Sequence, residues 1–118
     1  MSQSNAGTVR RYYDLVDEDA VGALVDLFAP DVVYERPGQD RIEGREELER
    51  FYREGRPLSA GTHEVHRVIE GREAVATRGT FTGEQDGEAV ELGFADVFTF
   101  DEEGRIATRF TYTDRDTV

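Results

Sequence analysis

The chain of 118 residues contains no cysteine and no lysine, and it has only two histidines and one methionine. The absence of cysteine excludes disulfides, thiolate nucleophiles and cysteine-ligated zinc or iron–sulfur centres. No segment approaches the roughly 18 consecutive apolar residues that cross a bilayer, and the N-terminal stretch lacks the apolar segment of a secretory signal. We therefore expect a cytoplasmic protein without membrane contact, whose chemistry relies on carboxylates, tyrosine, histidine, arginine or hydroxyl groups.

All fourteen basic residues are arginines, and the 26 acidic residues leave a formal net charge of −12. Because a basic stripe is needed to bind a phosphate backbone, this balance argues against a nucleic-acid partner. An acidic surface without lysine is what we expect of a halophilic organism, since high ionic strength screens the repulsion between like charges. A hydrophobic content of 37%, with seven phenylalanines and five tyrosines, favours a globular fold over a disordered chain.

Helical periodicity occupies the first half of the chain and strand alternation the second half. Residues 1–7 are predicted to be a disordered N-terminal tail, and residues 8–118 a single domain. Thr8 is the candidate cap of the first helix, and the second helix must stop at Pro30. The predicted helices span 8–18, 19–29 and 45–54, and the predicted strands span 31–36, 63–70, 73–82, 88–100 and 105–113. Helices followed by an antiparallel meander predict an α+β fold, in which the helices cover one face of a curved sheet.

Asp96 departs from the alternation of the predicted strand 88–100, because the other residues on its face are large and apolar. These neighbours are Val90, Leu92, Phe94, Phe98 and Phe100. Burying an ionised carboxyl costs several kcal/mol, so the position favours a protonated acid with a raised pKa that donates a hydrogen bond. Two alternatives stay open: backbone amides or an arginine satisfy the carboxylate, or a β-bulge turns it outward.

Each of the other candidate site residues has a structural explanation as well as a functional one. Tyr12 and Tyr52 face inward on their predicted helices, where such tyrosines usually belong to the core. Glu35 ends a short strand and is either an exposed strand-end residue or a catalytic carboxylate. His63 and His66 are three residues apart on a strand and therefore point to opposite faces, so we assign no metal site to them.

Three stretches of the sequence resemble a family that includes ketosteroid isomerases, SnoaL-like polyketide cyclases and nuclear transport factor two. They are Tyr12–Asp17, Ile42–Arg53 and Ala95–Ile106. The resemblance covers about residues 9–114. It implies a cone-shaped, nuclear transport factor two-like fold, in which three N-terminal helices pack on a curved, mostly antiparallel sheet.

Within this family the sequence is most similar to the isomerases. The resemblance places Tyr12 and Asp96 at the two donors of the oxyanion hole, Glu35 at the aspartate that moves the proton, and Tyr52 at a supporting tyrosine. It implies proton transfer on a small carbonyl or polyketide-like compound, without a metal or cofactor. As in ketosteroid isomerase, Asp96 would stay neutral in an apolar site. Glu35, however, is one methylene longer than the family's aspartate, which displaces the carboxylate.

The expected pocket is more polar than that of a steroid isomerase. Arg109 and Thr113 stand where the isomerases present apolar groups, so we expect a nonsteroidal or more polar substrate. Arg109 either pairs with a carboxylate such as Glu35 or anchors an anionic substrate. The expected substrate-binding residues are Tyr52, Phe94, Phe98 and Arg109.

Two further interpretations stay open. In a cyclase variant of the mechanism, Asp96 rather than Glu35 carries the acid–base role. Alternatively, the chain is a non-catalytic module that binds a small ligand or dimerises, because a fold does not fix a function. Members of the family commonly pair through the open face of the sheet, so the resemblance implies a homodimer.

Overall fold

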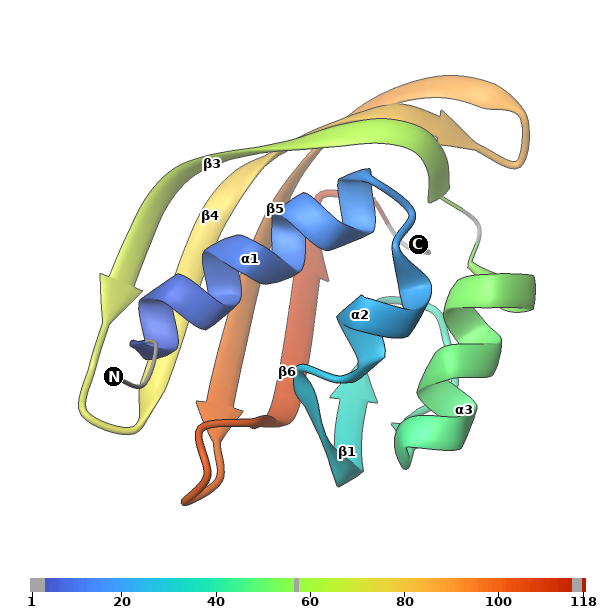
Figure 1. The fold of residues 1–118 in the computed structure, drawn as a ribbon. Helices are drawn as coiled ribbons and strands as arrows, with labels where there is room; N and C mark the ends of the chain where they lie inside the picture. Colours follow the sequence, from blue (N-terminus) through green and yellow to red (C-terminus); the bar gives the residue numbers. More distant parts are fainter. Residues whose placement is uncertain (1–3, 57, 116–117) are drawn as a thin grey trace.

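The computed structural model describes residues 4–56, 58–115 and 118, and it shows helices packed against one curved sheet (Figure 1). The helices are α1 (Asn5–Asp17), α2 (Val21–Val25) and α3 (Arg45–Arg50), and the π-helical turn η1 (Phe51–Gly55) continues α3. The strands are β1 (Phe28–Glu35), β2 (Ile42–Glu43), β3 (Leu58–Glu70), β4 (Ala74–Gln85), β5 (Glu88–Phe100) and β6 (Ile106–Thr113). None of the helices in these described residues has the length and apolar composition needed to cross a membrane.

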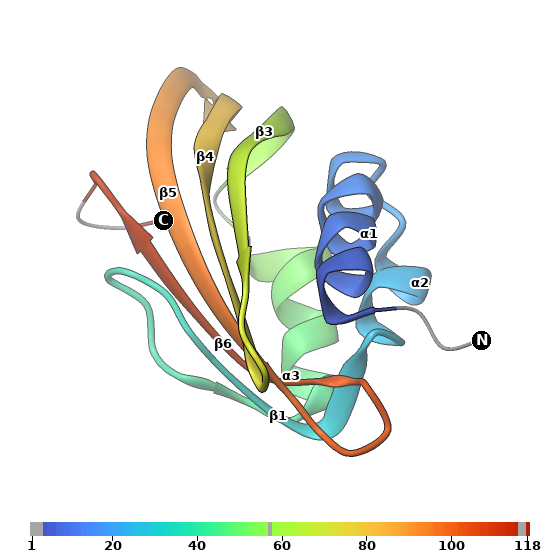
Figure 2. The same ribbon diagram turned by 90° about the vertical axis from the view of Figure 1, so that its left-hand side faces the viewer.

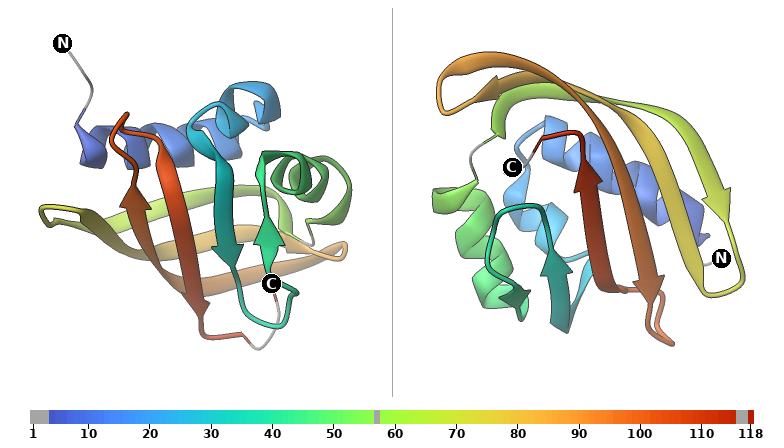
Figure 3. Two further views of the ribbon diagram at one scale, coloured as in Figure 1. Left: turned by 90° about the horizontal axis from the view of Figure 1, so that it is seen from below. Right: turned by 180° about the vertical axis from the view of Figure 1, so that it is seen from behind.

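The six strands form one sheet in the order β2-β1-β6-β5-β4-β3. Strands β1 and β6 run parallel, side by side, as Figure 3 shows, and the other neighbouring pairs are antiparallel. The helices all lie on the concave side of the sheet (Figure 2). The predicted α+β cone, with a curved and mostly antiparallel sheet, is therefore confirmed.

Helix α1 begins earlier than its sequence pattern predicted. Ser4, not Thr8, is its N-cap and accepts a hydrogen bond from the backbone N–H of Gly7 at 3.0 Å. Residues 4–7 therefore do not belong to a disordered tail, and residues 1–3 lie outside the described part of the chain. Tyr12, which was predicted to face inward on this helix, is buried, and so is its neighbour Tyr13.

A tight reversal ends α1 and places its last residue beside the sheet. Asp19 has a φ of 58°, and its N–H donates to the carbonyl of Val16, while Ala20 donates to the carbonyl of Leu15. These two bonds form the Schellman motif, which usually has glycine at the left-handed position. As a result, the side chain of Asp17 reaches β3, where it accepts a hydrogen bond from the backbone N–H of His63.

The second helix is shorter than predicted, because α2 ends at Val25 and Phe28 already belongs to β1. The carbonyl of Leu27 accepts a hydrogen bond from the backbone N–H of Ile106, the first residue of β6, so this segment is recruited into the sheet. Pro30 is tolerated in β1 because the pairing with β6 is irregular between Phe28 and Val33, where no ladder N–H is needed.

The antiparallel strands bend around the helices. Bulges interrupt the pairing of β3 with β4 between Ser59 and Thr62 and between Val65 and Arg67. The bare backbone of Gly79 allows Phe94 to pack across it, since a Cβ there would lie 2.8 Å from the Phe94 ring. This curvature brings the middle of β5 and β6 under α1, where the polar residues of the interior gather.

Candidate active site

Asp96 lies in β5, and its carboxylate is completely buried. Its Oδ1 accepts a hydrogen bond from the hydroxyl of Thr111. Its Oδ2 accepts one from the hydroxyl of Tyr13 and another from Nη2 of Arg109 at 3.0 Å. The burial predicted from the alternation is therefore correct, and three donors from two elements satisfy the carboxylate.

The prediction that Asp96 is a neutral acid is wrong. Burial alone would raise its pKa, but the Arg109 guanidinium and the hydrogen bonds from Thr111 and Tyr13 outweigh burial and lower the pKa below its usual value. Asp96 is thus an ionised carboxylate that accepts hydrogen bonds and cannot donate one. The alternative in which an arginine satisfies the carboxylate is the one that the structure supports.

Arg109 is the centre of the buried polar cluster. It lies on β6, and its guanidinium stacks between the rings of Tyr12 and Tyr34, at 4.5 and 4.6 Å from their centroids. Its Nη2 binds Asp96, and its Nη1 donates to the hydroxyls of Tyr12 and Tyr52. Its partner is therefore Asp96 and not Glu35, which the sequence analysis had considered.

Tyr12 and Tyr52 form a coupled pair of hydroxyl groups with their oxygens 2.5 Å apart. Burial raises the pKa of both residues, so both stay protonated at neutral pH. Because Arg109 donates to both oxygens, one phenolic proton lies between them and the other has no acceptor among the described residues. The pair therefore retains one proton for an outside acceptor. The predicted oxyanion hole required Tyr12 and Asp96 to donate side by side to one substrate oxygen, but Arg109 lies between them and bonds both.

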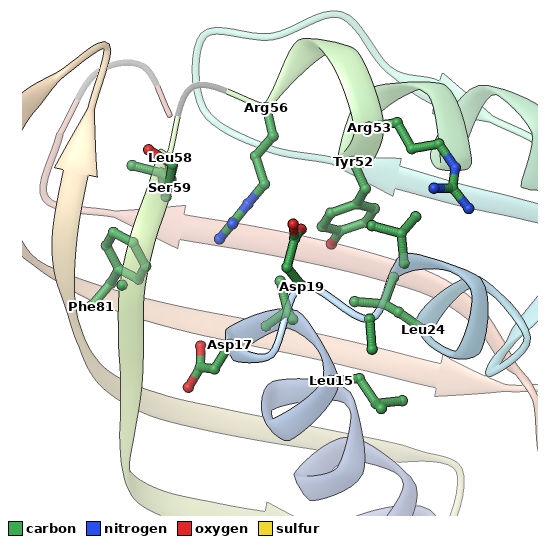
Figure 4. Close-up of a pocket in the computed structure, with 14 residues that line it drawn as sticks. Leu15, Asp17, Asp19, Leu24, Tyr52, Arg53, Arg56, Leu58, Ser59 and Phe81 are labelled. Carbon is green, nitrogen blue, oxygen red and sulfur yellow. The ribbon is translucent and has the colours of Figure 1, made fainter.

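Two adjoining cavities share Arg56, Leu58 and Phe81 in their walls. The outer cavity has a volume of about 440 Å³ and opens between the end of α1, η1 and the start of β3 (Figure 4). The Tyr52 side chain points into it, close to the carboxylate of Asp19 and the guanidinium of Arg56. The inner cavity, of about 20 Å³, has room for about one water molecule and reaches the buried polar cluster.

The inner cavity is lined by more positive than negative side chains. Arg36, Arg56 and Arg109 contribute to its wall, whereas Asp96 is the one acidic side chain among its described lining residues. Val118, the last residue of the sequence, also lines it, and its main-chain oxygen accepts a hydrogen bond from Nε of Arg36. The Nε atoms of Arg56 and Arg109 are buried and have no hydrogen-bond partner in the described part of the chain. In a protein with a net charge of −12, this is a local concentration of positive charge.

The structure does not bring Glu35 into the cluster. Its carboxylate is about half exposed and pairs with Arg41 at 3.1 Å. In the second half of β1 the buried residues are Val32 and Tyr34, and Arg36 follows at the same alternation, on the same face. The side chain that lines the inner cavity at this end of β1 is therefore a guanidinium, which cannot accept a proton.

The remaining predicted residues divide between cavity wall and core. Phe94 lines the inner cavity, as does Thr113. Phe98 is fully buried, and its ring packs 5.9 Å from that of Tyr12, so it supports the cluster from behind. Among the described residues, Phe98 lines neither cavity of the candidate site, so its predicted role in substrate binding is wrong.

Sequence analysis missed two buried features of the site. His63 faces the interior and binds Asp17, while His66 is exposed and bonds Thr80, so the predicted opposite orientation of the histidines is confirmed. The pairing of His63 with Asp17 spans 46 residues and has no local sequence signal. Arg36 was also missed, although alternation counted from Val32 would have placed it inside.

Comparisons with known proteins agree with this geometry. The fold is that of the nuclear transport factor two-like class: a protein of this class from Burkholderia pseudomallei superposes with a TM-score of 0.84 at 24% identity, covering 95% of this chain and 92% of the other. An LEH-like epoxide hydrolase from M. tuberculosis gives a TM-score of 0.81 at 23% identity, covering 93% of this chain and 82% of the other.

The family follows from the sequence match. Residues 9–109 match the SnoaL-like domain, and the chain belongs to the SnoaL-like domain family. A steroid delta-isomerase from Nocardioides simplex is 34% identical over 111 residues, which cover 92% of this chain and 88% of that protein. The resemblance to the isomerase and cyclase family is therefore confirmed.

Proposed function

We propose that this protein is an enzyme that catalyses proton transfer on a small carbonyl compound, with Tyr52 as the hydrogen-bond donor to the carbonyl oxygen. The observation that carries the proposal is the position of the Tyr52 hydroxyl. It belongs to a residue in the wall of the 440 Å³ cavity, and behind it lie the hydroxyl of Tyr12 and the guanidinium of Arg109. Proton transfer of this kind, by enolisation or isomerisation, requires no cofactor.

The chain of donors behind Tyr52 suits the stabilisation of a developing oxyanion. When Tyr52 donates to a carbonyl oxygen, its own oxygen can accept from both Tyr12 and Arg109, which increases the polarity of its O–H bond. The donors are in place before substrate binds and are shielded from water, so little reorganisation energy is required during the reaction. In this proposal Tyr52 contacts the substrate and Tyr12 supports it, the reverse of the roles that the resemblance implied.

The charge of the inner cavity supports a polar or anionic substrate. The guanidinium groups of Arg36, Arg56 and Arg109 outnumber Asp96, the one acidic side chain in the described wall, although Arg36 is already bonded to a main-chain oxygen of Val118. Arginine binds carboxylates through paired N–H donors, and the unpartnered Nε of Arg56 is available at the junction of the cavities. We infer that the substrate is a small ketone with a carboxylate or another anionic group, and that it is not a steroid.

The experiment compares β,γ-unsaturated ketones, one steroidal, one small and neutral, and one small with a carboxylate, by the absorbance of the conjugated product. We expect turnover of the carboxylate-bearing ketone to exceed that of the neutral one. Tyr52→Phe should lower kcat by about 10²–10³-fold, the usual effect of losing one oxyanion donor. Glu35→Gln should stay within about twofold of the wild type, because its side chain is paired outside the cavity.

The outcomes separate the interpretations. If Glu35→Gln abolishes turnover, the original isomerase assignment is right and the role given to Tyr52 is wrong. If Asp96→Asn abolishes turnover of a polyketide-like substrate in a variant that still folds, the cyclase interpretation gains support.

A non-catalytic ligand-binding module is the second candidate. It is favoured by the complete pairing of Asp96 and by the small volume of the inner cavity, which leaves little room for a substrate beside the buried cluster. Against it, Tyr12 and Asp96 do line a common cavity. If no ketone turns over but carboxylate-bearing ketones raise the thermal midpoint, the binding module is the better description.

A further inference from the structure

We propose that His63 is the general base of the candidate active site and that Asp17 is its positioning residue. The inference rests on the proposed function, which names an oxygen-stabilising group but no group that removes the proton. It adds a residue pair that neither the resemblance nor the sequence motifs had assigned a role.

Asp17 fixes the orientation of the His63 ring. One carboxylate oxygen accepts a hydrogen bond from the backbone N–H of His63 at 2.9 Å, and the other lies 2.6 Å from Nδ1. An ionised carboxylate only accepts hydrogen bonds, so Nδ1 carries the ring proton and Nε2 carries the free lone pair. The Nε2 atom makes no hydrogen bond to any described residue. The ring therefore presents a basic nitrogen on the edge opposite Asp17.

His63 belongs to the wall of the inner cavity, and its ring is close to the junction of the two cavities. The ring centroid lies 4.8 Å from that of Phe81, which lines both cavities. The rings of Phe94 and Tyr13 lie at 5.3 and 5.4 Å. Only 7% of the His63 side chain is exposed, so these rings hold the imidazole in one position.

The surroundings keep the imidazole neutral. The groups that face it are Asp17 and Tyr13 from α1, Arg56 after η1 and Arg109 from β6, while β4 and β5 contribute the uncharged rings described above. Burial lowers the pKa of His63, and the two arginines lower it further, which outweighs the opposing effect of Asp17. A neutral imidazole with a free lone pair is the form that acts as a base near pH 7.

No other described side chain in the inner wall combines a free lone pair with suitable basicity. Glu35 lies outside the cavity, and Asp96 is held as a carboxylate by three donors. Arg36, Arg56 and Arg109 are permanent cations. His63 therefore supplies, from the inner wall, the base that Glu35 cannot; the carboxylate of Asp19 in the outer wall beside Tyr52 is the alternative, which unchanged turnover of folded His63→Gln would favour.

The proton balance of the step is complete without another reactant. Nε2 takes a proton from the carbon next to the carbonyl, and the electron pair of the broken C–H bond forms the carbon–carbon double bond of the enolate. The carbonyl oxygen takes up the negative charge and accepts the hydrogen bond from Tyr52. The imidazolium, which the Asp17 carboxylate stabilises, then returns the proton to the γ-carbon, and His63 is neutral again.

The first test uses the protein without substrate. The chain has two histidines, so NMR of ¹⁵N-labelled protein resolves both, and the exposed His66 serves as the internal reference. We expect His63 as the Nδ1–H tautomer with a titration midpoint below the ordinary value of about 6.5. Asp17→Asn should lower the midpoint of His63 further and admit the other tautomer. An Nε2–H tautomer of His63, or a midpoint above the ordinary value of about 6.5, would overturn the proposal.

The second test measures turnover of the ketones used for the proposed function. His63→Gln should lower kcat by about 10²–10⁴-fold, the range of general-base catalysis, while the control His66→Gln stays within twofold. The wild-type kcat/KM should decrease towards acid pH with the midpoint that NMR gives for His63 in the free protein, and Asp17→Asn should shift this midpoint. Circular dichroism verifies the fold of each variant.

The two proposals fail in different ways. If Tyr52→Phe is impaired while folded His63→Gln turns over like the wild type, the role of His63 is refuted and the proposed function stands. If the wild type turns over none of the ketones, the proposed function fails, and the catalytic role of His63 fails with it.

Discussion

The ion pair between Asp96 and Arg109 gives a prediction about stability that does not depend on any substrate. Both side chains are almost completely buried, at 0% and 4% exposure, with Nη2 and Oδ2 3.0 Å apart. Arg109→Met leaves the Asp96 charge without its partner, and Asp96→Asn leaves a buried guanidinium that cannot lose its proton. Removing one partner of a buried pair costs about 3–5 kcal/mol. For a domain of this size, that corresponds to a decrease in Tm of about 12–20 °C.

The double variant distinguishes the charge effect from lost packing. Asp96→Asn combined with Arg109→Met removes both charges, so its cost should be about 2–3 kcal/mol less than the sum of the single costs. The assay is urea unfolding at pH 7 with comparable slopes for all four proteins. If the losses in free energy of unfolding are additive, or if Arg109→Met loses less than about 1 kcal/mol, Asp96 and Arg109 do not form a buried ion pair.

The same pair determines the response to acid. The pKa of Asp96 is lower in the folded protein than its ordinary value, so the pair stabilises the fold above that value, about pH 3.9. This contribution is lost as the pH falls through the folded-state pKa. As the pH falls below about 4, the free energy of unfolding should therefore decrease less for Asp96→Asn than for the wild type. Urea unfolding at each pH measures this difference.

Further predictions concern the fold and its assembly. Gly79→Ala places a Cβ 2.2 Å from the carbonyl oxygen of Glu64 and should cost about 1–3 kcal/mol in urea unfolding, whereas Gly22→Ala, with open space around the Cβ, should stabilise α2 by up to about 1 kcal/mol. Asp19→Gly should raise Tm because it removes a left-handed non-glycine residue; a lower Tm would show that the Asp19 side chain contributes more than the backbone costs. If the acidic surface is an adaptation to salt, Tm should rise between dilute buffer and molar salt, and a flat response refutes this. A homodimer should appear in light scattering at about twice 13.3 kDa, and a species of 13.3 kDa alone contradicts it.

The sequence was most informative where a residue interrupts a strong pattern. Asp96 interrupts an apolar face of β5, and alternation alone predicted that it is buried. Its ionisation could not be predicted this way, because that depends on Arg109 in the next strand. The register that sets Phe98 opposite Arg109 is a tertiary property, and a single sequence does not reveal it.

The wrong predictions have two causes: the ambiguous alternation of inward and outward residues in β1, and long-range contacts. Val32, Val33 and Tyr34 are all apolar, so the sequence does not show which of them face the interior, and Glu35 was assigned to the wrong side. The spacing of Phe28 after Val25 fits a helix, but Phe28 pairs with Ile106 of β6 and belongs to a strand instead. Long-range contacts of this kind override local helical preference.

The cations of the inner cavity are all arginines, and this has a consequence for the way binding responds to pH. A lysine in such a position would lose its proton as the pH rises, but a guanidinium remains charged at every pH at which the protein is folded. The potential that Arg36, Arg56 and Arg109 create is therefore a constant of the site. Above the acidic range in which the carboxylates of the site take up protons, the pH dependence of affinity for an anionic ligand then reports the ionisation of the ligand itself or of His63, so a pair of ligands with different acid strengths distinguishes these two sources directly.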